Sequence, residues 1–360
     1  MKILLLGEFS SLHKYLKEGL LELGDNNVKL YANGDGWKKI GGSDGDLFAT
    51  NNSGFQRVYQ FYCEPFSKSK SFRDYDVVQL IGPQVYSPVV NTPLINRIKK
   101  ENGCLSLVAA GEDYALSQAY NEGKFEYYVF DSNKESLSNY TSDTMRSKMI
   151  VKTEKKVAAL ADTIIPSLYE YSVGYQNYDK LHGVIPFPVN LNGIQYRDNV
   201  PKEKLVFFHG LNREASKGTT YIRGALERLQ AKYPNDVEVV IDGKMPFDKY
   251  TQVMSRANVV IDQCLSYGYG INACIAMAQG KVVMSGSRPE TLQAFGVEQS
   301  PIVPIQPDVD QIYKQMEYLL DNKREIAEKG TQSRIYVETM HDHVCVAQRY
   351  VDAWKSTGKV

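Results

Sequence analysis

The sequence predicts an α/β protein of two domains, each built around a parallel β-sheet wound in both directions. Three observations lead to this prediction. The chain has 360 residues, and a folded domain usually has about 100–200. Short apolar runs of strand length alternate with amphipathic segments at helical spacing. The alternation stops at a proline-rich stretch, Ile185-Pro186-Phe187-Pro188-Val189-Asn190, and then begins again, which is typical of an interdomain linker.

Strands and helices alternate through the first half of the chain. Apolar runs predict buried strands at residues 3–6, 28–32, 75–81, 105–110 and 163–166. The spacing of leucines predicts a helix at residues 12–23, with Ser10 or Ser11 as a candidate N-cap and Gly24 as its stop. Further helices are expected at residues 93–100 and 152–160, and the polar residues 114–148 predict an irregular excursion with short helices.

The second half repeats this alternation. Strands are predicted at residues 205–208, 237–241, 259–261 and 282–284. Helices are predicted at residues 219–231 and 309–329, with Gly330 as the stop of the latter, and from about 343 to 354. We therefore expect one domain at residues 1–190 and a second at residues 191–342.

Composition excludes several classes of partner. The 42 basic and 42 acidic residues give a formal net charge of zero, so no overall field favours nucleic acid. No apolar run approaches the roughly 20 residues of a membrane span, and the short apolar start does not fit a signal peptide. The five cysteines are scattered without a Cys-x-x-Cys pair, which is typical of reduced thiols in a cytoplasmic protein.

The strongest local signal is a glycine-containing loop at residues 266–272, which follows the strand ending at Ile261 and opens a helix. Main-chain N–H groups at a helix N-terminus, with about half a positive charge from the helix dipole, bind anions. We expect a diphosphate to contact Gln263, Tyr267, Gly268, Tyr269, Gly270, Ile271 and Asn272. The alternative is a tight strand–helix turn whose glycines serve only the backbone conformation.

A second signal follows the strand at residues 205–208. The loop His-Gly-Leu-Asn-Arg-Glu-Ala-Ser-Lys-Gly-Thr starts at His209 and opens a helix, with Gly210 at its beginning. Arg213 and Lys217 are cations that can clamp phosphate oxygens beside a helix N-terminus. The alternative is a solvated basic loop. Both loops follow strands of one predicted sheet, and ligands of doubly wound sheets bind at that edge.

These motifs resemble the nucleotide-binding domain of the glycosyltransferases of family 4, which have the GT-B fold. Gly210, Arg213, Lys217 and Gly218 match a glycine, an arginine and a Lys-Gly pair that opens a helix in that family. The closer matches are the segments 257–262, 268–270 and 276–283, followed by Pro289-Glu290. The first half resembles the acceptor domain more weakly, through residues 7–24, 110–113 and 184–188.

The resemblance implies two facing Rossmann-like domains, with a C-terminal helix at about 343–360 crossing back to the first domain. It implies a hexosyltransferase that moves a sugar from a nucleotide diphosphate to a glycan, lipid-linked or other glycoconjugate acceptor, with a peripheral membrane contact compatible with such acceptors. The transfer would be retaining and metal-independent and need no cofactor. Arg213, Lys217 and the helix N-terminus at Ile271 would stabilise the leaving diphosphate.

One departure from the family pattern leaves three functions open. The family carries two glutamates around the Gly-x-Gly turn, and this sequence has Tyr267 and Ile275 at those positions. Neither side chain offers the carboxylate that would accept hydrogen bonds from sugar hydroxyls. The alternatives are an active glycosyltransferase, a catalytically inactive relative that binds a nucleotide sugar, and a sugar-nucleotide epimerase of the same fold.

In the first domain, His13 follows the first strand and Asp113 follows the strand at residues 105–110, so both are candidate catalytic residues facing the cleft. His13 could also lie on the surface of the first helix, and His209 is a candidate for either a phosphate site or a hydrogen-bonded core. We expect no metal site, because no Asp-x-Asp pair ends a strand and the His-Asp-His run at 341–343 opens a helix. The first strand also lacks the Gly-x-Gly-x-x-Gly run of nicotinamide enzymes.

Overall fold

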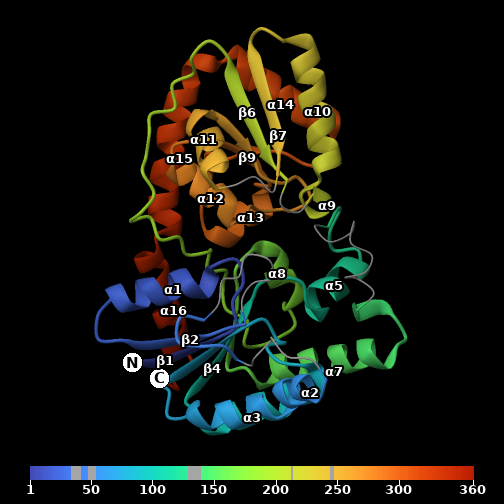
Figure 1. The fold of residues 1–360 in the computed structure, drawn as a ribbon, viewed down its shortest axis with the longest axis vertical. Helices are drawn as coiled ribbons and strands as arrows, with labels where there is room; N and C mark the ends of the chain where they lie inside the picture. Colours follow the sequence, from blue (N-terminus) through green and yellow to red (C-terminus); the bar gives the residue numbers. More distant parts are fainter. Residues whose placement is uncertain (34–41, 48–53, 129–138, 212–213, 244–246) are drawn as a thin grey trace. The chain divides into compact units, whose positions relative to one another are not determined.

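The computed structural model describes residues 1–33, 42–47, 54–128, 139–211, 214–243 and 247–360 (Figure 1). The chain divides into two compact units. Unit 1 consists of Met1–Lys124, Glu135–Asn190 and His343–Val360, and unit 2 consists of Phe125–Lys134 and Leu191–Asp342. Arg213, one of the predicted phosphate-binding residues, lies outside the described residues.

Unit 1 contains a parallel five-stranded sheet. Its strands are β1 (Lys2–Leu6), β2 (Asn27–Tyr31), β3 (Val77–Ile81), β4 (Cys104–Ala109) and β5 (Thr163–Pro166). Their order is β2-β1-β3-β4-β5, so the winding direction reverses between β1 and β3. The three central strands are almost wholly buried, which is the pattern of a sheet covered by helices on both faces.

The helices of unit 1 include the last helix of the chain. They are α1 (Leu12–Glu22), α2 (Phe55–Tyr62), α3 (Glu64–Lys68), η2 (Ser69–Ser71), α4 (Pro88–Lys100), α5 (Tyr114–Asn121), α7 (Met145–Leu160), α8 (Tyr169–Gly174) and α16 (His343–Lys355). Helix α16 packs against α1 (Figure 1), and a side chain at Gly19 would collide with the carbonyl of His343. The C-terminal helix therefore returns to the first domain, as predicted.

Unit 2 contains a second parallel five-stranded sheet. Its strands are β6 (Leu205–Gly210), β7 (Val237–Asp242), β8 (Val259–Ile261), β9 (Val282–Ser285) and β10 (Val303–Pro304), and their order is β10-β9-β8-β6-β7. The direction of winding reverses between β6 and β8. Strand β10 was not predicted, because two residues carry no recognisable pattern.

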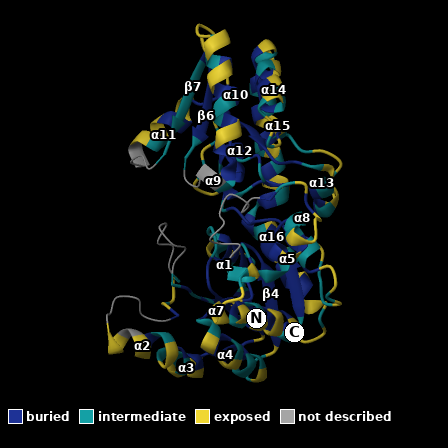
Figure 2. Ribbon diagram, turned by 90° about the vertical axis from the view of Figure 1, so that its right-hand side faces the viewer, coloured by how far each residue is buried: buried dark blue, intermediate teal, exposed yellow. Residues whose placement is uncertain are grey.

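Helices pack against this second sheet, and two of them share an apolar core with its strands. They are α9 (Glu214–Lys217), α10 (Thr219–Lys232), α11 (Phe247–Arg256), α12 (Ile271–Ala278), α13 (Pro289–Phe295), α14 (Val309–Asp321), η3 (Lys323–Glu325) and α15 (Ile326–His341). Helices α10 and α14 pack together and bury Leu226 and Met316 against the strands. Figure 2 shows which residues this packing buries: those of β6 are buried, whereas those on the outer side of α10 are exposed.

The predicted end of one helix was wrong, and the predicted N-cap of another is right in position only. The predicted helix at residues 309–329 is interrupted at Asn322, and Gly330 lies inside α15 instead of stopping it. A side chain at Gly330 would collide with the carbonyl of Gly280, so this glycine allows a close approach of two backbones. Ser11 precedes α1, but its side chain makes no capping hydrogen bond.

Among the described residues, no helix is long and apolar enough to span a bilayer.

Candidate functional site

The point at which the winding of unit 2 reverses brings the two predicted loops together. Strand β6 ends at Gly210 and β8 at Ile261, and the two strands are neighbours in the sheet. The loops that follow them lead into α9 and α12. In a doubly wound sheet the adjacent loops diverge at this point and leave a crevice at the carboxyl edge, where ligands bind.

Lys217 is fixed at this edge by its backbone and by its charge. Its side-chain Nζ lies 3.1 Å from Asp262 Oδ1, and both side chains are largely buried. Its carbonyl accepts a hydrogen bond from the N–H of Cys264. Gly218 follows with a left-handed φ of +72°, and a side chain there would collide with Cys264. Lys217 and Gly218 therefore pack directly against the loop that follows β8.

Asp262 connects this lysine to the N-terminus of α12. Its Oδ2 accepts a hydrogen bond of 3.3 Å from the N–H of Gly270, the residue that precedes the helix. The N–H groups of Ile271 and Asn272 lie in the first turn, where a helix provides no acceptor of its own. Asn272 is exposed. An ammonium group and the positive end of a helix thus converge at one place, and a carboxylate balances them.

This arrangement can bind an anion. A lysine ammonium has three donors, and Asp262 takes one of those of Lys217. The helix dipole adds about half a positive charge at the same point. Asp262 was not predicted to take part, although its place directly after a strand could have drawn attention to it. Because its carboxylate lies where an anion would come, it also opposes the binding of one.

The remaining glycines and polar residues of the loop shape its turn. Gln263 donates a weak hydrogen bond of 3.4 Å to the carbonyl of Gly268, whose own N–H donates to Ser266 Oγ. A side chain at Gly286 would collide with the carbonyl of Ser266, so the residue that follows β9 lies close to the backbone of the loop. Gly210 lies in β6 in an ordinary strand conformation, paired in register with Asp242.

The two tyrosines of the loop do not face the Lys217–Asp262 pair. Tyr269 is completely buried, and its hydroxyl is hydrogen-bonded to Tyr336 and to His341 Nε2, at 2.9 Å in each case. This tyrosine belongs to the packing between α12 and α15. The prediction assigned it to the ligand on the basis of its position between two glycines, which does not show where its side chain points.

Tyr267, where the resemblance to family 4 predicts a glutamate, is covered by another part of the chain. Its hydroxyl accepts a hydrogen bond of 2.9 Å from the N–H of Glu126, and its ring contacts Phe125 and Tyr127. Arg288 lies over the same ring and forms a bidentate ion pair with Glu126. Only 4% of Tyr267 is exposed. No pattern in the sequence indicates that residues 125–127 pack here.

His13 lies inside the core of unit 1. Its Nδ1–H donates to the carbonyl of Gly7 at 2.8 Å, and its Nε2 accepts from the amide of Gln79. The other end of that amide accepts hydrogen bonds from Ser106 and from the indole of Trp354. Complete burial lowers the pKa of His13 to about 4. The imidazole is therefore neutral and has no nitrogen left for a substrate, which is the arrangement of a structural histidine.

Asp113 is a helix cap in a cluster of carboxyl groups. Its Oδ1 accepts from the N–H of Leu116 in the first turn of α5, and its Oδ2 accepts from the hydroxyl of Tyr175 at 2.6 Å. Burial raises its pKa. Burial, together with the charge of Asp113, also raises the pKa of Glu112 to about 7 and that of Glu154 to about 8. The fully engaged Asp113 stabilises the start of α5.

The other histidines singled out in the sequence are also engaged within their units. His209 Nδ1–H donates to the carbonyl of Ile261 and its Nε2 accepts from Thr219, and burial lowers its pKa to about 4. His341 contacts Tyr269, whereas His343 Nε2 lies 2.9 Å from Glu22. Within the described part of the chain, no group of three or more His, Cys, Asp or Glu side chains could hold a metal ion.

Comparisons with known proteins find likeness in structure only. No family model matches the sequence, and no curated protein matches it. A sucrose-phosphate synthase from Thermosynechococcus elongatus has a TM-score of 0.64 at 13% identity and covers 99% of this chain and 98% of its own. HepE from Anabaena, solved in complex with UDP-glucose, has a TM-score of 0.65 at 13% identity, with coverage of 99% and 100%.

A UDP-GlcNAc 2-epimerase from Neisseria meningitidis, bound to UDP-GlcNAc, also matches, with a TM-score of 0.55 at 12% identity and coverage of 99% and 100%. At these identities the comparisons establish the fold. The chain has the two-domain α/β architecture of GT-B proteins, with one five-stranded parallel sheet in each domain. The fold predicted from the resemblance is confirmed.

Proposed function

We propose that the chain is a glycosyltransferase whose nucleotide diphosphate donor binds at the carboxyl edge of the unit 2 sheet. The observation that carries this proposal is the meeting of Lys217 with the N-terminus of α12 where the winding of the sheet reverses. A diphosphate is the common part of such donors, and it needs a fixed cation and main-chain N–H groups.

The same residues suit the chemistry of sugar transfer. When the bond between the sugar and the diphosphate breaks, negative charge grows on the leaving phosphate. Lys217 and the first-turn N–H groups of Ile271 and Asn272 would stabilise that charge from fixed positions. We accordingly propose a retaining transfer without a metal. The structures of HepE with UDP-glucose and UDP make a uridine nucleotide the first donor to test.

The acceptor belongs to the same proposal. We propose a glycan or a lipid-linked glycoconjugate as the acceptor, with a peripheral membrane contact in the lipid-linked case and the cytoplasm as the place of reaction. Arg213 is retained as a proposed second phosphate contact, because it lies shortly before Lys217 in the sequence. His13 and Asp113 are left out of the catalytic residues, because their polar atoms are engaged inside unit 1.

The test is a panel of UDP, GDP, ADP and their sugars in a thermal-unfolding assay. A ligand at 100 times its Kd stabilises the native state by about 2.7 kcal/mol. We expect a uridine nucleotide to raise Tm in the wild-type chain and to have much less effect in Lys217→Met. Lys232→Met is the matched control, because that lysine lies in the same unit and pairs on the surface with Glu317. Equal shifts in all three proteins would reject the site.

A second function has a specific observation in its favour. Tyr267 and Ile275 replace the family's glutamates, and the hydroxyl of Tyr267 is engaged by the N–H of Glu126. An inactive protein that binds a nucleotide sugar would fit that arrangement. Product analysis with labelled UDP-sugars separates the functions: sugar transfer or donor hydrolysis supports the enzyme, whereas nucleotide binding without turnover of any donor supports the inactive binder. An epimerised free sugar would indicate the third function considered above.

A further inference from the structure

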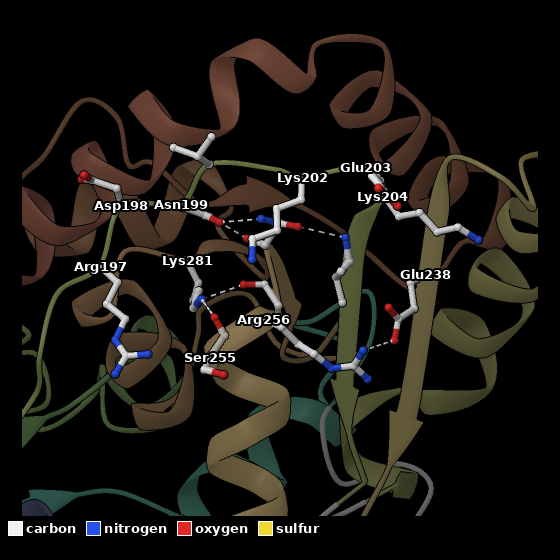
Figure 3. A pocket seen from close by; sticks show the side chains of 14 residues that line it. Arg197, Asp198, Asn199, Lys202, Glu203, Lys204, Glu238, Ser255, Arg256 and Lys281 are labelled. Atoms are coloured by element: carbon white, nitrogen blue, oxygen red, sulfur yellow. Dashed lines mark hydrogen bonds and ion pairs between the residues drawn. The ribbon is translucent and has the colours of Figure 1, made fainter.

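A pocket lies at the opposite edge of the unit 2 sheet from Lys217 (Figure 3). It is formed where the chain enters the strands: Lys204 directly precedes β6, Asn258 precedes β8 and Lys281 precedes β9. Its volume is about 690 Å³, within the range of about 300–1,000 Å³ that is usual for small-molecule sites. The pocket and the candidate donor site are therefore at opposite ends of the same strands.

The charges around this edge pocket are unevenly matched. Five basic side chains line it, those of Arg197, Lys202, Lys204, Arg256 and Lys281, together with three acidic ones, those of Asp198, Glu203 and Glu238. Arg256 forms an ion pair of 2.6 Å with Glu238 on one side, and Lys204 donates to the carbonyl of Pro234. Arg197 and Lys202 make no hydrogen bond or ion pair with any residue in the described parts of the chain. With Arg256 paired to Glu238, four basic and two acidic side chains remain, so the excess charge of the lining is positive.

Lys281 is the buried member of this group. Only 5% of the residue is exposed, and its Nζ donates to the carbonyls of Ala257 and Ser255 at the end of α11. These carbonyls accept two of its three protons and provide no formal negative charge. Burial, and next the positive charge of Arg197, lower the pKa of Lys281 to about 8. Two cations are thus held close enough to repel one another, and a bound anion would relieve that repulsion.

The backbone that carries Arg197 and Lys202 is fixed before any ligand binds. Between them, Asn199 is buried and paired with Asn258 through two hydrogen bonds of 2.8 and 2.9 Å. Gly280, with a left-handed φ of +80°, lies so close to the carbonyl of Arg197 that a side chain there would come within 2.6 Å of it. The backbone that carries these two cations is therefore held against the sheet by contacts at Arg197 and Asn199.

We propose that this edge pocket binds a phosphate-bearing small molecule, with a phosphate group held by Arg197, Lys202 and Lys281. A guanidinium group binds two phosphate oxygens at once, and ammonium groups add point charge. The pocket volume leaves room for the rest of such a ligand. The site is independent of the donor site, because the two share no residue and lie at opposite edges of the sheet.

The experiment is an isothermal titration of the full chain with inorganic pyrophosphate at fixed ionic strength. Wild-type protein should show two sites. In Arg197→Ala/Lys202→Ala, the Kd of pyrophosphate for the edge pocket should rise at least tenfold. In Lys217→Met/Asp262→Asn, pyrophosphate should still bind in the edge pocket with the wild-type Kd. Lys204→Ala is the matched control, because this lysine lines the same pocket but is directed to Pro234.

The outcomes separate this inference from the proposed function. Unchanged binding of pyrophosphate in Arg197→Ala/Lys202→Ala, or equal loss in Lys204→Ala, would overturn the edge pocket whatever the donor site does. A single site in the wild type that only the pocket variant removes would support the inference and contradict the donor site. Both replaced side chains are exposed and have no partner among the residues that the structure describes, so the variant should fold, and its Tm verifies this.

Discussion

The two sheets reverse their winding in the same way, yet the residues at the two reversal points differ in kind. In unit 2, Lys217 and Asp262 are charged groups placed beside the open end of α12. In unit 1, the corresponding point between β1 and β3 is closed by packing, because a side chain at Gly7 would collide with Ile81. The neighbouring His13 is neutral and hydrogen-bonded to the carbonyl of Gly7.

The difference shows that the same sheet topology occurs at both points, whereas the side chains determine whether a ligand can bind there. Unit 1 differs in another way at this point, because Ser10 and Ser11 both have left-handed φ angles of 52° and 68°. Such a conformation costs about 1–2 kcal/mol for a residue other than glycine. Unit 1 therefore has backbone strain at its reversal point, where unit 2 has a lysine–aspartate pair.

The largest expected effect is on ligand binding at the reversal point of unit 2. Lys217→Met should raise the Kd for a nucleotide diphosphate about 100-fold, which is about 2.8 kcal/mol, because it removes a cation and leaves the Asp262 carboxylate unbalanced. Titration of the ligand measures the change. Since an unpaired buried carboxylate also costs stability, Lys217→Met/Asp262→Asn serves as the variant that should fold normally, with a loss of about tenfold. Wild-type affinity in both would remove Lys217 from the site.

A substitution at the reversal point of unit 1 should change the stability of the protein and leave nucleotide binding unchanged. His13→Leu leaves the carbonyl of Gly7 and the amide of Gln79 without their partner, and should lower the free energy of unfolding by about 2 kcal/mol. Urea unfolding measures this loss. Nucleotide affinity should stay at the wild-type value under native conditions. A large loss of affinity in a folded His13→Leu protein would mean that the histidine contacts the ligand after all.

The carboxyl cluster makes unit 1 sensitive to alkaline pH. The pKa of Glu154 is raised by burial from 4.5 to about 8, so the folded state holds a proton that the unfolded state releases. Its stabilising contribution is complete below pH 4.5 and is lost as the pH rises toward 8. Glu154→Gln keeps the neutral form and should reduce the loss of stability between pH 6.5 and 8 by about 2 kcal/mol.

This window avoids the two buried histidines, whose lowered pKa values cost stability only as the pH falls from 6.5 toward 4. Hydrogen exchange at pH 6.5 and 8 measures the stability of unit 1, through β4 and α7, separately from the stability of unit 2, through β6. The prediction fails if Glu154→Gln leaves the pH dependence of unit 1 unaltered, or if unit 2 shows the same change.

The smallest expected effect has the opposite sign. Asp262→Asn should tighten the binding of a nucleotide diphosphate about tenfold, or about 1.4 kcal/mol, because it removes the negative charge that competes for Lys217 and the N–H of Gly270. The same titration measures it. Weaker binding in this variant would show instead that Asp262 serves to position the lysine.

The sequence predicts the fold better than it predicts the site, for a physical reason. Strands such as β5 and β8 were predicted residue for residue, because a buried strand shows its apolar character in its own residues. The same logic placed the loops of Lys217 and Gly270 at one edge. Where a side chain points depends on distant residues, so the core positions of His13 and Tyr269 could not be predicted from neighbouring sequence.

The position of Gly330 illustrates the same limit. A glycine after a periodic segment is a sound sign of a helix end, and nothing local shows that Gly280 would approach it closely enough to exclude a side chain. The contact of residues 125–127 with Tyr267 is a similar case, because these residues are remote from Tyr267 in the sequence.

The central claim is that a nucleotide diphosphate binds where Lys217 meets α12, and hydrogen exchange with and without UDP tests it most directly. UDP should slow exchange in the peptides that contain residues 214–219 and 262–274, and leave the turn at residues 7–13 of unit 1 unaffected. Protection confined to unit 1, or no protection at residues 270–272 under conditions in which UDP is bound, would contradict the claim.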